Sequence, residues 1–345
     1  MSDLMSMPLH KLMEAVEEMG EKKFRAKQLY SWLHEKLIFD YHEMSNLSAA
    51  FRQQLSEQYP LPVIKEVKRY VSKLDGTTKY LFELFDGNII ESVLMKYKHG
   101  NSVCISSQVG CRMGCAFCAS TLDGLLRNLS ASEMLMQVYL IQHLSGERVS
   151  NVVVMGTGEP FDNYESLMAF LHIITSEQGL HISQRNITVS TCGIVPRIYD
   201  FAKEGLSVTL AVSLHAPTDE MRKRLMPIAY QYSIEEILKA CHYFVEETGR
   251  RVTFEYSLVK GENDSEEHAR LLAGLLKGLL CHVNLIPVNP ISERDYVQSE
   301  RESIEKFKNM LEKYQINVTI RREMGRDIAA ACGQLRRDFK QGGTQ

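Results

Sequence analysis

The feature that most constrains this chain is a regular alternation of strand-like and helical segments that begins near residue 100. Short apolar runs alternate with longer amphipathic segments that end at glycine, proline or polar residues. Such alternation predicts parallel βα units, because parallel strands need a long crossover between them. The strand-like runs are 102–106, 151–155, 187–191, 208–213, 252–258, 282–287 and 318–321. About six units predict a partial (βα)6-type TIM barrel of the α/β class, with functional residues after the carboxyl ends of its strands.

The first hundred residues follow a different pattern. A helical part ends at the proline-rich break 59–62, and Asp86-Gly87 then separates two strand-like runs, 79–85 and 88–95. An Asp-Gly pair between such runs is typical of a β-hairpin. The predicted divisions are a small N-terminal helical accessory domain (1–75), a β extension or linker (76–100) and a barrel core that ends in a cysteine-bearing loop (101–345).

Composition places the chain among soluble globular proteins. Its 345 residues are 44% hydrophobic and 24% charged, and the net charge is −3. These values exclude a disordered chain and a basic nucleic-acid coat, so an RNA surface would have to be a local patch. The N-terminus mixes acidic residues into its apolar positions, and no run reaches the roughly 18 apolar residues of a membrane span. We therefore expect a cytoplasmic protein without a secretory signal or a membrane partner.

Three cysteines carry the sharpest chemical signal. Cys111, Cys115 and Cys118 have the spacing C-x3-C-x2-C in a chain with eight cysteines, too few for a disulfide scaffold. Three neighbouring thiolates can hold one metal centre. A structural zinc site would need a fourth ligand, and no second Cys pair or His pair stands nearby. A 4Fe–4S cluster can instead be held through three irons, which leaves the fourth iron open to another ligand.

These cysteines, with Phe117 before the last of them, resemble the motif of the radical S-adenosylmethionine (SAM) superfamily. Further motifs resemble the RlmN/Cfr family of rRNA adenosine methyltransferases, in the same order along nearly the whole chain. They are 24–28, 103–111, 155–160, 212–217, 284–290 and 330–335. Pro160 after Glu159, and Pro287 before Val288-Asn289-Pro290, favour the RlmN type over the Cfr type. The resemblance implies a radical SAM barrel with one 4Fe–4S cluster on the three cysteines and two SAM molecules per turnover.

The resemblance also assigns roles to individual residues. The residues expected to contact SAM are Gly158, Glu159, Ser190, Ser213, Leu214, His215 and Asn289. Cys332 is expected to carry a methyl group as S-methylcysteine, and Glu91 to accept a proton from the adenine ring. Cys104 is then expected to attack Cys332 and leave a transient disulfide. Taken singly, these residues have ordinary structural interpretations as turn residues, packed thiols or a solvated strand residue.

The implied reaction is methylation of carbon 2 of an adenosine in 23S rRNA, at the peptidyl transferase centre. In many relatives an anticodon-loop adenosine of tRNA is a second substrate. Basic residues within 22–27, and six Lys and Arg against three Asp and Glu within 321–345, indicate candidate RNA surfaces. We expect a monomer that is served by an external flavodoxin-like electron donor and a thiol reductant.

Three alternatives stay open on the residues alone. The first is Cfr-type methylation of carbon 8 of the same adenosine. The second is another radical SAM reaction, such as the activation of a glycyl-radical enzyme, which would need neither Cys104 nor Cys332. The third is a zinc-stabilised RNA-binding protein without catalysis. The remaining cysteines, Cys192, Cys241 and Cys281, match no motif and are interpreted as packing residues.

Overall fold

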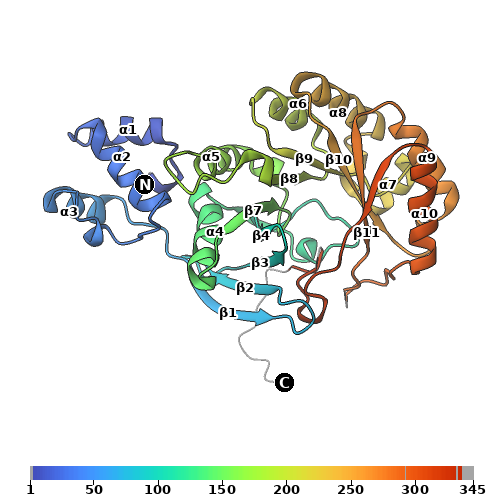
Figure 1. The fold of residues 1–345 in the computed structure, drawn as a ribbon, viewed down its shortest axis with the longest axis horizontal. Coiled ribbons are helices and arrows are strands. Elements are labelled where there is room, and N and C mark those ends of the chain that lie inside the picture. The colour runs from blue at the N-terminus through green and yellow to red at the C-terminus, as the bar shows by residue number, and fades with distance from the viewer. Residues whose placement is uncertain (1–2, 292, 332, 336–345) are drawn as a thin grey trace.

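The computed structural model describes residues 3–291, 293–331 and 333–335 (Figure 1). Ten strands form one open, mixed sheet. In spatial order they are β1 (Lys65–Val71), β2 (Thr78–Glu83), β3 (Ile89–Tyr97), β4 (Gly100–Ile105), β7 (Val149–Val154), β8 (Ile187–Thr191), β9 (Thr209–Ser213), β10 (Val252–Leu258), β11 (Cys281–Pro287) and β12 (Asn317–Ile320). Neighbours from β1 to β4 are antiparallel, and all pairings from β4 to β12 are parallel.

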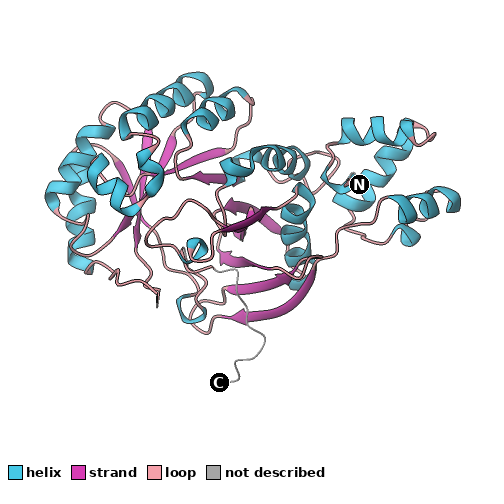
Figure 2. Ribbon diagram, turned by 180° about the vertical axis from the view of Figure 1, so that it is seen from behind, coloured by secondary structure: helices cyan, strands magenta, loops and turns pink. Residues whose placement is uncertain are grey.

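Helical crossovers connect the parallel strands, as the alternation in the sequence predicts. They are α4 (Ala131–Ser145), α5 (Tyr164–Ile174), α6 (Val195–Lys203), α7 (Asp219–Leu225) with α8 (Ile234–Thr248), α9 (Glu266–Leu276) and α10 (Arg301–Lys313). Figure 2 shows these helices, in cyan, around the outside of the magenta strands. Since β1 and β12 are the two edges of the sheet, the fold is a partial (βα)6 barrel that ends in one further parallel strand.

Local sequence signals fix the ends of the crossover helices. At the start of α4 the Ser130 hydroxyl accepts a hydrogen bond from Glu133 N, and the Glu133 carboxylate accepts one from Ser130 N. At its end Gly146 takes a left-handed backbone conformation that glycine adopts at low cost. The same arrangement begins and ends α8. Crossover lengths, and with them the positions of the strands, therefore follow from short capping patterns.

Three helices precede the sheet and gather at one end of the molecule, on the side of α4 and α5 (Figure 1). They are α1 (Leu9–Glu18), α2 (Lys23–His34) and α3 (Ala49–Gln58). Ser132 N, in α4, donates to the Ser6 hydroxyl over 2.8 Å, and His34 contacts the Tyr139 hydroxyl over 3.0 Å. Burial lowers the pKa of His34 to about 3, so its ring is neutral in this contact. The helical part is thus joined to the barrel through α4.

Some elements were not predicted from the sequence. The sequence does not indicate strand β1, because four of its seven residues are charged and no apolar alternation is visible. It is an edge strand whose residues are mostly exposed. The small hairpin of β5 (Gln108–Gly110) and β6 (Leu125–Asn128) was missed because both strands are very short. Short 3-10 helices occupy Leu4–Ser6, Tyr41–Glu43, Ala119–Thr121, Pro160–Asn163, Gln184–Asn186, Pro227–Tyr230 and Arg326–Ile328.

Candidate active site

The cysteine loop, residues 111–124, follows β4 and is closed at its base by the β5–β6 hairpin. Gly110 pairs with Leu125, and Cys111 N donates to Gly124 O over 3.1 Å. Gly110 has a φ of +77°, and a Cβ atom there would lie 1.9 Å from the Gly124 oxygen, so a side chain does not fit. The loop therefore leaves the hairpin and returns to it at a fixed point, with the three cysteines between.

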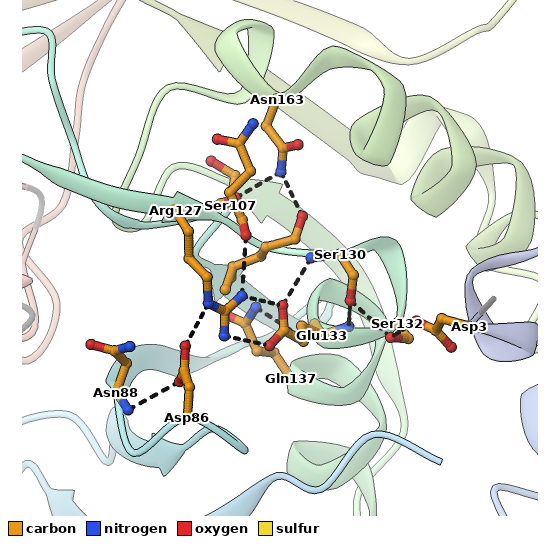
Figure 3. A network of polar contacts seen from close by, with 12 residues as sticks. Asp3, Asp86, Asn88, Ser107, Arg127, Ser130, Ser132, Glu133, Gln137 and Asn163 are labelled. Atoms are coloured by element: carbon orange, nitrogen blue, oxygen red, sulfur yellow. Dashed lines mark hydrogen bonds and ion pairs between the residues drawn. The ribbon is translucent and has the colours of Figure 1, made fainter. Parts of the chain in front are cut away.

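The outer side of this hairpin is held by charged groups around Arg127 (Figure 3). Its guanidinium donates to Asp86, in the β2–β3 turn, over 2.6 Å, and to both carboxylate oxygens of Glu133 over 2.8 Å each. Burial acts to raise the pKa of Asp86, but hydrogen bonds from Arg127 and Asn88 outweigh it and give a pKa of about 2. The network ties β6 to the β2–β3 turn and to the start of α4.

Inside the cysteine loop, backbone and hydroxyl contacts fix the three cysteines. Ala116 N donates to Leu225 O, at the end of α7, over 2.9 Å, and Cys118 N donates to Cys115 O over 3.2 Å. The Thr121 hydroxyl lies 3.1 Å and 2.9 Å from the carbonyl oxygens of Cys115 and Cys118. The loop is thus held largely by its own main chain.

The three thiols fit a cluster better than a single ion. Among the described residues, no three His, Cys, Asp or Glu side chains come close enough together to hold one metal ion. In a 4Fe–4S cluster each thiolate binds a different iron, so the ligands surround the cube instead of meeting at one point. Burial raises the pKa of Cys111 to about 12 and that of Cys115 well above its usual value. Positive irons favour the thiolate forms that burial disfavours.

The three cysteines line a single cavity together with most residues expected to contact SAM. This first cavity has a volume of about 150 Å³ and opens to solvent. The predicted residues in its lining are Cys111, Cys115, Cys118, Gly158, Glu159, Ser190, Ser213, His215 and Asn289. Leu214 is instead fully buried in the core, where its N–H donates to Glu255 O over 3.1 Å. The structure thus brings all the predicted SAM contacts except Leu214 to one cavity at the carboxyl ends of the strands.

Glu159 is suited to bind a cationic group. Its buried carboxylate accepts hydrogen bonds from Cys192 N over 2.7 Å and from Phe161 N over 2.9 Å. Burial raises the pKa of this carboxyl, and the two amide donors oppose that rise. A ligand ammonium beside it would stabilise the carboxylate, so the site fits the amino group of a SAM methionine.

His215 links the cysteine loop to the barrel strands. Its Nδ1 accepts a hydrogen bond from Ser257 N over 2.9 Å, which assigns the proton of the neutral ring to Nε2. Burial lowers the pKa of His215 to about 3 and keeps the ring neutral. The ring meets Phe117 edge-on, with centroids 4.9 Å apart, and Asn263 donates to the His215 carbonyl over 2.7 Å. His215 can therefore offer an N–H donor in a fixed direction.

Arg222 is a residue of this region that the sequence did not single out. It is fully buried in α7, and its guanidinium donates to Cys192 O over 2.6 Å and to Leu214 O over 3.3 Å. It thereby joins the chain segments that follow β8 and β9. A lone arginine on a short polar helix usually lies in solvent, so the sequence carries no signal of this role.

Glu255 and Arg321 form a second unpredicted feature, a charged pair in the lining of the first cavity. Their closest charged atoms are 3.9 Å apart, and Asn284 donates to Glu255 over 2.9 Å. Burial raises the pKa of Glu255, and Arg321 opposes that effect. A carboxylate inside the apolar run 252–258 was a usable signal, because such a residue must either face a ligand or be paired.

A second, smaller cavity adjoins the first and contains Cys104. The two cavities share Met155, Ile286, Asn289 and Arg321. Cys104 is buried in β4 and packs in a cluster with Met324, Ala330 and Leu335. Cys332 lies outside the described residues; its neighbour Ala331 lines the second cavity and its neighbour Gly333 lines the first.

Glu91 lies apart from the SAM contacts. It is buried in β3, 3.1 Å from the ammonium of Lys79, which also donates to Ala329 O over 3.2 Å. Within the described part of the chain, Glu91 lines neither of the two cavities. The three remaining cysteines pack as predicted, although Cys192 also borders the first cavity.

Comparison with known proteins decides the family. The family model "Radical SAM superfamily" matches residues 105–272, and "Ribosomal RNA large subunit methyltransferase N-terminal domain" matches residues 2–60. Proteins described as "Probable dual-specificity RNA methyltransferase RlmN" from Lachnoclostridium phytofermentans and Lachnospira eligens are 61% and 62% identical. Each matches 98% of this chain, and the match covers 95% and 97% of those relatives. The chain belongs to the RlmN family.

A solved structure agrees with this assignment. The crystal structure of a radical SAM methyltransferase from Sphaerobacter thermophilus is 44% identical and superposes with a TM-score of 0.93, over 98% of this chain and all of that one. The chain is therefore a radical SAM RNA methyltransferase whose cofactors are a 4Fe–4S cluster and SAM. This assignment is incompatible with the non-catalytic zinc protein considered above. No helix of the described residues is long and apolar enough to cross a membrane.

Proposed function

We propose that this chain methylates carbon 2 of an adenosine in 23S rRNA, at the peptidyl transferase centre, and of an anticodon-loop adenosine in tRNA, through a methylated Cys332. When bound, the cluster and SAM supply a methyl group and a 5′-deoxyadenosyl radical. The proposal rests on the two adjoining cavities, one lined by the three cluster cysteines and the other by Cys104. The sequence neighbours of Cys332 border both cavities. The description of the relatives as dual-specificity RNA methyltransferases supports two RNA substrates.

Each site residue then has one task. We assign the cluster to Cys111, Cys115 and Cys118, and SAM to Gly158, Glu159, Ser190, Ser213, His215 and Asn289. Leu214, which lies in the core behind this lining, is left out of the assignment. Cys332 carries the transferred carbon on its sulfur, and Glu91 accepts the proton that leaves the adenine ring. Cys104 attacks the Cys332 sulfur and releases the methylated base. The disulfide that forms is reopened by two electrons from an external thiol reductant, once for every two SAM molecules consumed.

The packing of Cys104 supports its part in this scheme. It shares an apolar cluster with Ala330 and Leu335, which lie two residues before and three residues after Cys332. A disulfide needs Cα atoms within about 7 Å of each other, so the partner of Cys104 must belong to a segment that packs against it. The C-terminal loop is such a segment.

The remaining proposals concern the setting of the enzyme. We propose a cytoplasmic monomer that takes electrons from a flavodoxin-like donor. The chain divisions 1–75, 76–100 and 101–345 are likewise proposed as an RNA-contacting helical domain, a β extension and the catalytic barrel. Strand β1, at the end of the first division, pairs with β2 and so lies with the β extension.

The test is SAM-dependent methylation of 23S rRNA and tRNA fragments by the anaerobically reconstituted protein, with mass mapping of the product. A methyl group on carbon 2 is the expected result, and a methyl group on carbon 8 would replace the proposal with the Cfr-type activity. Cys332→Ala should abolish methylation, whereas Cys241→Ala, which removes a core thiol of α8 that lines neither cavity in the described part of the chain, should retain it. Full methylation by Cys332→Ala would refute the methyl-cysteine mechanism.

A second variant separates the roles of the two proposed redox cysteines. Cys104→Ala keeps the methyl carrier and removes the attacking thiol, so the base should stay covalently bound to the protein through Cys332. Mass spectrometry of nuclease-treated protein detects such an adduct. Normal release of methylated RNA by Cys104→Ala would show that Cys104 does not resolve the intermediate.

A further inference from the structure

The C-terminal loop, residues 321–335, follows β12 and contains Cys332. It is held on both sides of this cysteine by contacts with other parts of the chain. The contacts before Cys332 reach the β1–β2 turn, residues 72–77, and strand β2. The contacts after it reach the cysteine loop. In Figure 1 the C-terminal loop, in dark red, lies beside the turn between β1 and β2.

Two carboxylates link the loop and the turn in opposite directions. Asp75, in the turn, accepts a hydrogen bond from Gly325 N of the loop over 3.0 Å. Asp327, in the loop, accepts hydrogen bonds from the Ser72 hydroxyl over 2.6 Å and from Lys73 N over 2.9 Å. Each segment thus supplies one carboxylate to the other, across 250 to 255 residues of sequence.

The turn presents its carboxylate in a fixed direction. One oxygen of Asp75 accepts a hydrogen bond from Thr77 N over 2.9 Å. The other oxygen accepts the bond from Gly325 N of the loop. The packing is close, since a Cβ atom at Gly325 would lie 2.9 Å from the Thr77 methyl group. Burial acts to raise the pKa of Asp75, but the hydrogen bonds from Gly325 and Thr77 outweigh it and lower that pKa. The pKa of Asp327 is lowered chiefly by the hydrogen bond from Ser72.

Strand β2 adds a third contact near Glu91. The buried Lys79 ammonium bonds both to Glu91, over 3.1 Å, and to the carbonyl of Ala329, over 3.2 Å. Ala329 precedes Cys332 by three residues. The same lysine therefore bridges the proposed proton acceptor and the loop.

On the other side of Cys332 the loop is bonded to the segment that follows the last cluster cysteine. Ala119 N donates to Gly333 O over 2.8 Å, and the Ser120 hydroxyl donates to Leu335 O over 2.8 Å. Both donors belong to the 3-10 helix Ala119–Thr121, directly after Cys118. The loop thus spans the space between the cluster side of the site and the Glu91 side.

We propose that Asp75 and Asp327 are positioning residues, which hold the C-terminal loop so that Cys332 stays placed for methyl transfer to RNA. This inference rests on the role of Cys332 proposed above. Neither carboxylate lines the described parts of the two cavities. Their loss should therefore leave SAM binding and the cluster intact and lower the share of radical events that end in methylated RNA. Small displacements of a reacting group are enough for this, since a misplacement of about 1 Å can cost roughly a hundredfold in rate.

The test compares Asp75→Asn, Asp327→Asn and the double variant with Asp200→Asn. Asp200 is a matched control, because it pairs with Arg197 on the surface of α6, away from the loop. The main readout is the amount of 5′-deoxyadenosine formed per methylated adenine. The double variant is expected to raise this ratio roughly tenfold, each single variant less, and the control not at all. Asp327→Glu, which keeps two acceptor oxygens where Asn keeps one, should restore part of the coupling.

Two further measurements keep the result interpretable. Melting temperature and iron content should match those of the wild type, and amide exchange in residues 325–331 should become faster in the variants. If the wild type methylates RNA through Cys332 and no variant changes the ratio of 5′-deoxyadenosine to methylated adenine, this inference is overturned and the proposed function is not. An equal rise in Asp200→Asn would also overturn it, because a surface charge would then suffice. RNA methylation that never places a methyl group on wild-type Cys332 would overturn the proposed function and this inference with it.

Discussion

The two loops that bring cysteines to the site are held in different ways. The cysteine loop, 111–124, is anchored mainly through its own main chain, at its base to Gly124 and at its far side to Leu225 of α7. Its side-chain contacts include the ion pair of Arg112 with Asp162 and the Ser120 bond to the C-terminal loop. The C-terminal loop, 321–335, is anchored largely through side chains. Asp327 and Gln334 belong to the loop itself, and the side chains of Asp75, Lys79 and Ser120 bond to its main chain.

The difference matches the tasks proposed for the two loops. A main-chain anchor does not titrate and tolerates most side-chain substitutions, whereas a carboxylate anchor is lost by one substitution or by protonation. The cysteine loop has to hold a cluster in one place. In the proposed mechanism the C-terminal loop carries a thiol that is methylated, bonded to a base and oxidised in turn. We therefore expect the cysteine loop to lose its conformation only when a supporting element such as α7 is disrupted. The C-terminal loop should lose its order gradually, as single side-chain contacts are removed.

The largest effect is expected from removing the support of the cysteine loop in α7. Arg222→Met leaves the buried carbonyls of Cys192 and Leu214 without their charged donor, at a cost of about 3 kcal/mol. Because Leu225 O of the same helix accepts the hydrogen bond from Ala116 N, the cysteine loop should become more mobile as well. We expect a melting temperature lower by roughly 5 °C and less iron per chain after reconstitution.

The control for this prediction is Arg197→Met on the surface of α6, where an exposed ion pair with Asp200 contributes little. Its melting temperature and iron content should equal those of the wild type. Full iron content in Arg222→Met would show that the cysteine loop does not depend on α7.

The barrel and the main cavity could be predicted because their signals are local. The runs 187–191 and 252–258 coincide with β8 and β10, since each is an apolar segment bounded by turn residues. Residues that follow strand ends, such as Glu159 and His215, meet in one cavity because parallel strands all end at one face. The family motifs then supplied the chemistry.

The anchors of the site could not be predicted, because their partners are distant in the sequence and are mostly backbone groups. Nothing near Asp75 or Asp327 indicates that they bond to each other's segments, and a charged residue in a turn is usually solvated. The role of Arg222 could not be predicted for the same reason, since its partners are backbone carbonyls of other segments. For Glu91 the family motif predicts a role, but its ion-pair partner cannot be predicted. The pairing with Lys79 follows only from the register of β2 against β3.

A smaller effect is expected from a single hydroxyl of the cysteine loop. Thr121→Val removes the hydroxyl that lies within 3.1 Å of the carbonyls of Cys115 and Cys118, at a cost of about 1 kcal/mol. The loop should then release iron to a chelator faster, while the melting temperature changes little. Thr248→Val is a matched control, because it removes a similar hydroxyl bond to Phe244 O in α8. Equal iron release from both variants would contradict a local effect on the cysteine loop.

The smallest effect is expected from pH. The pKa values of Asp75 and Asp327 lie below their usual value of 3.8, so their contribution is complete above that pH and is lost as the pH falls through the lowered values. The pKa of Asp86 in the Arg127 network is about 2, so that network should persist to stronger acid. Amide exchange protection of residues 325–331 should be constant from about pH 8 to about pH 5 and should fall below about pH 4, before that of β6. Loss of protection in both segments at the same pH would mean that the carboxylates do not set the acid stability of the C-terminal loop.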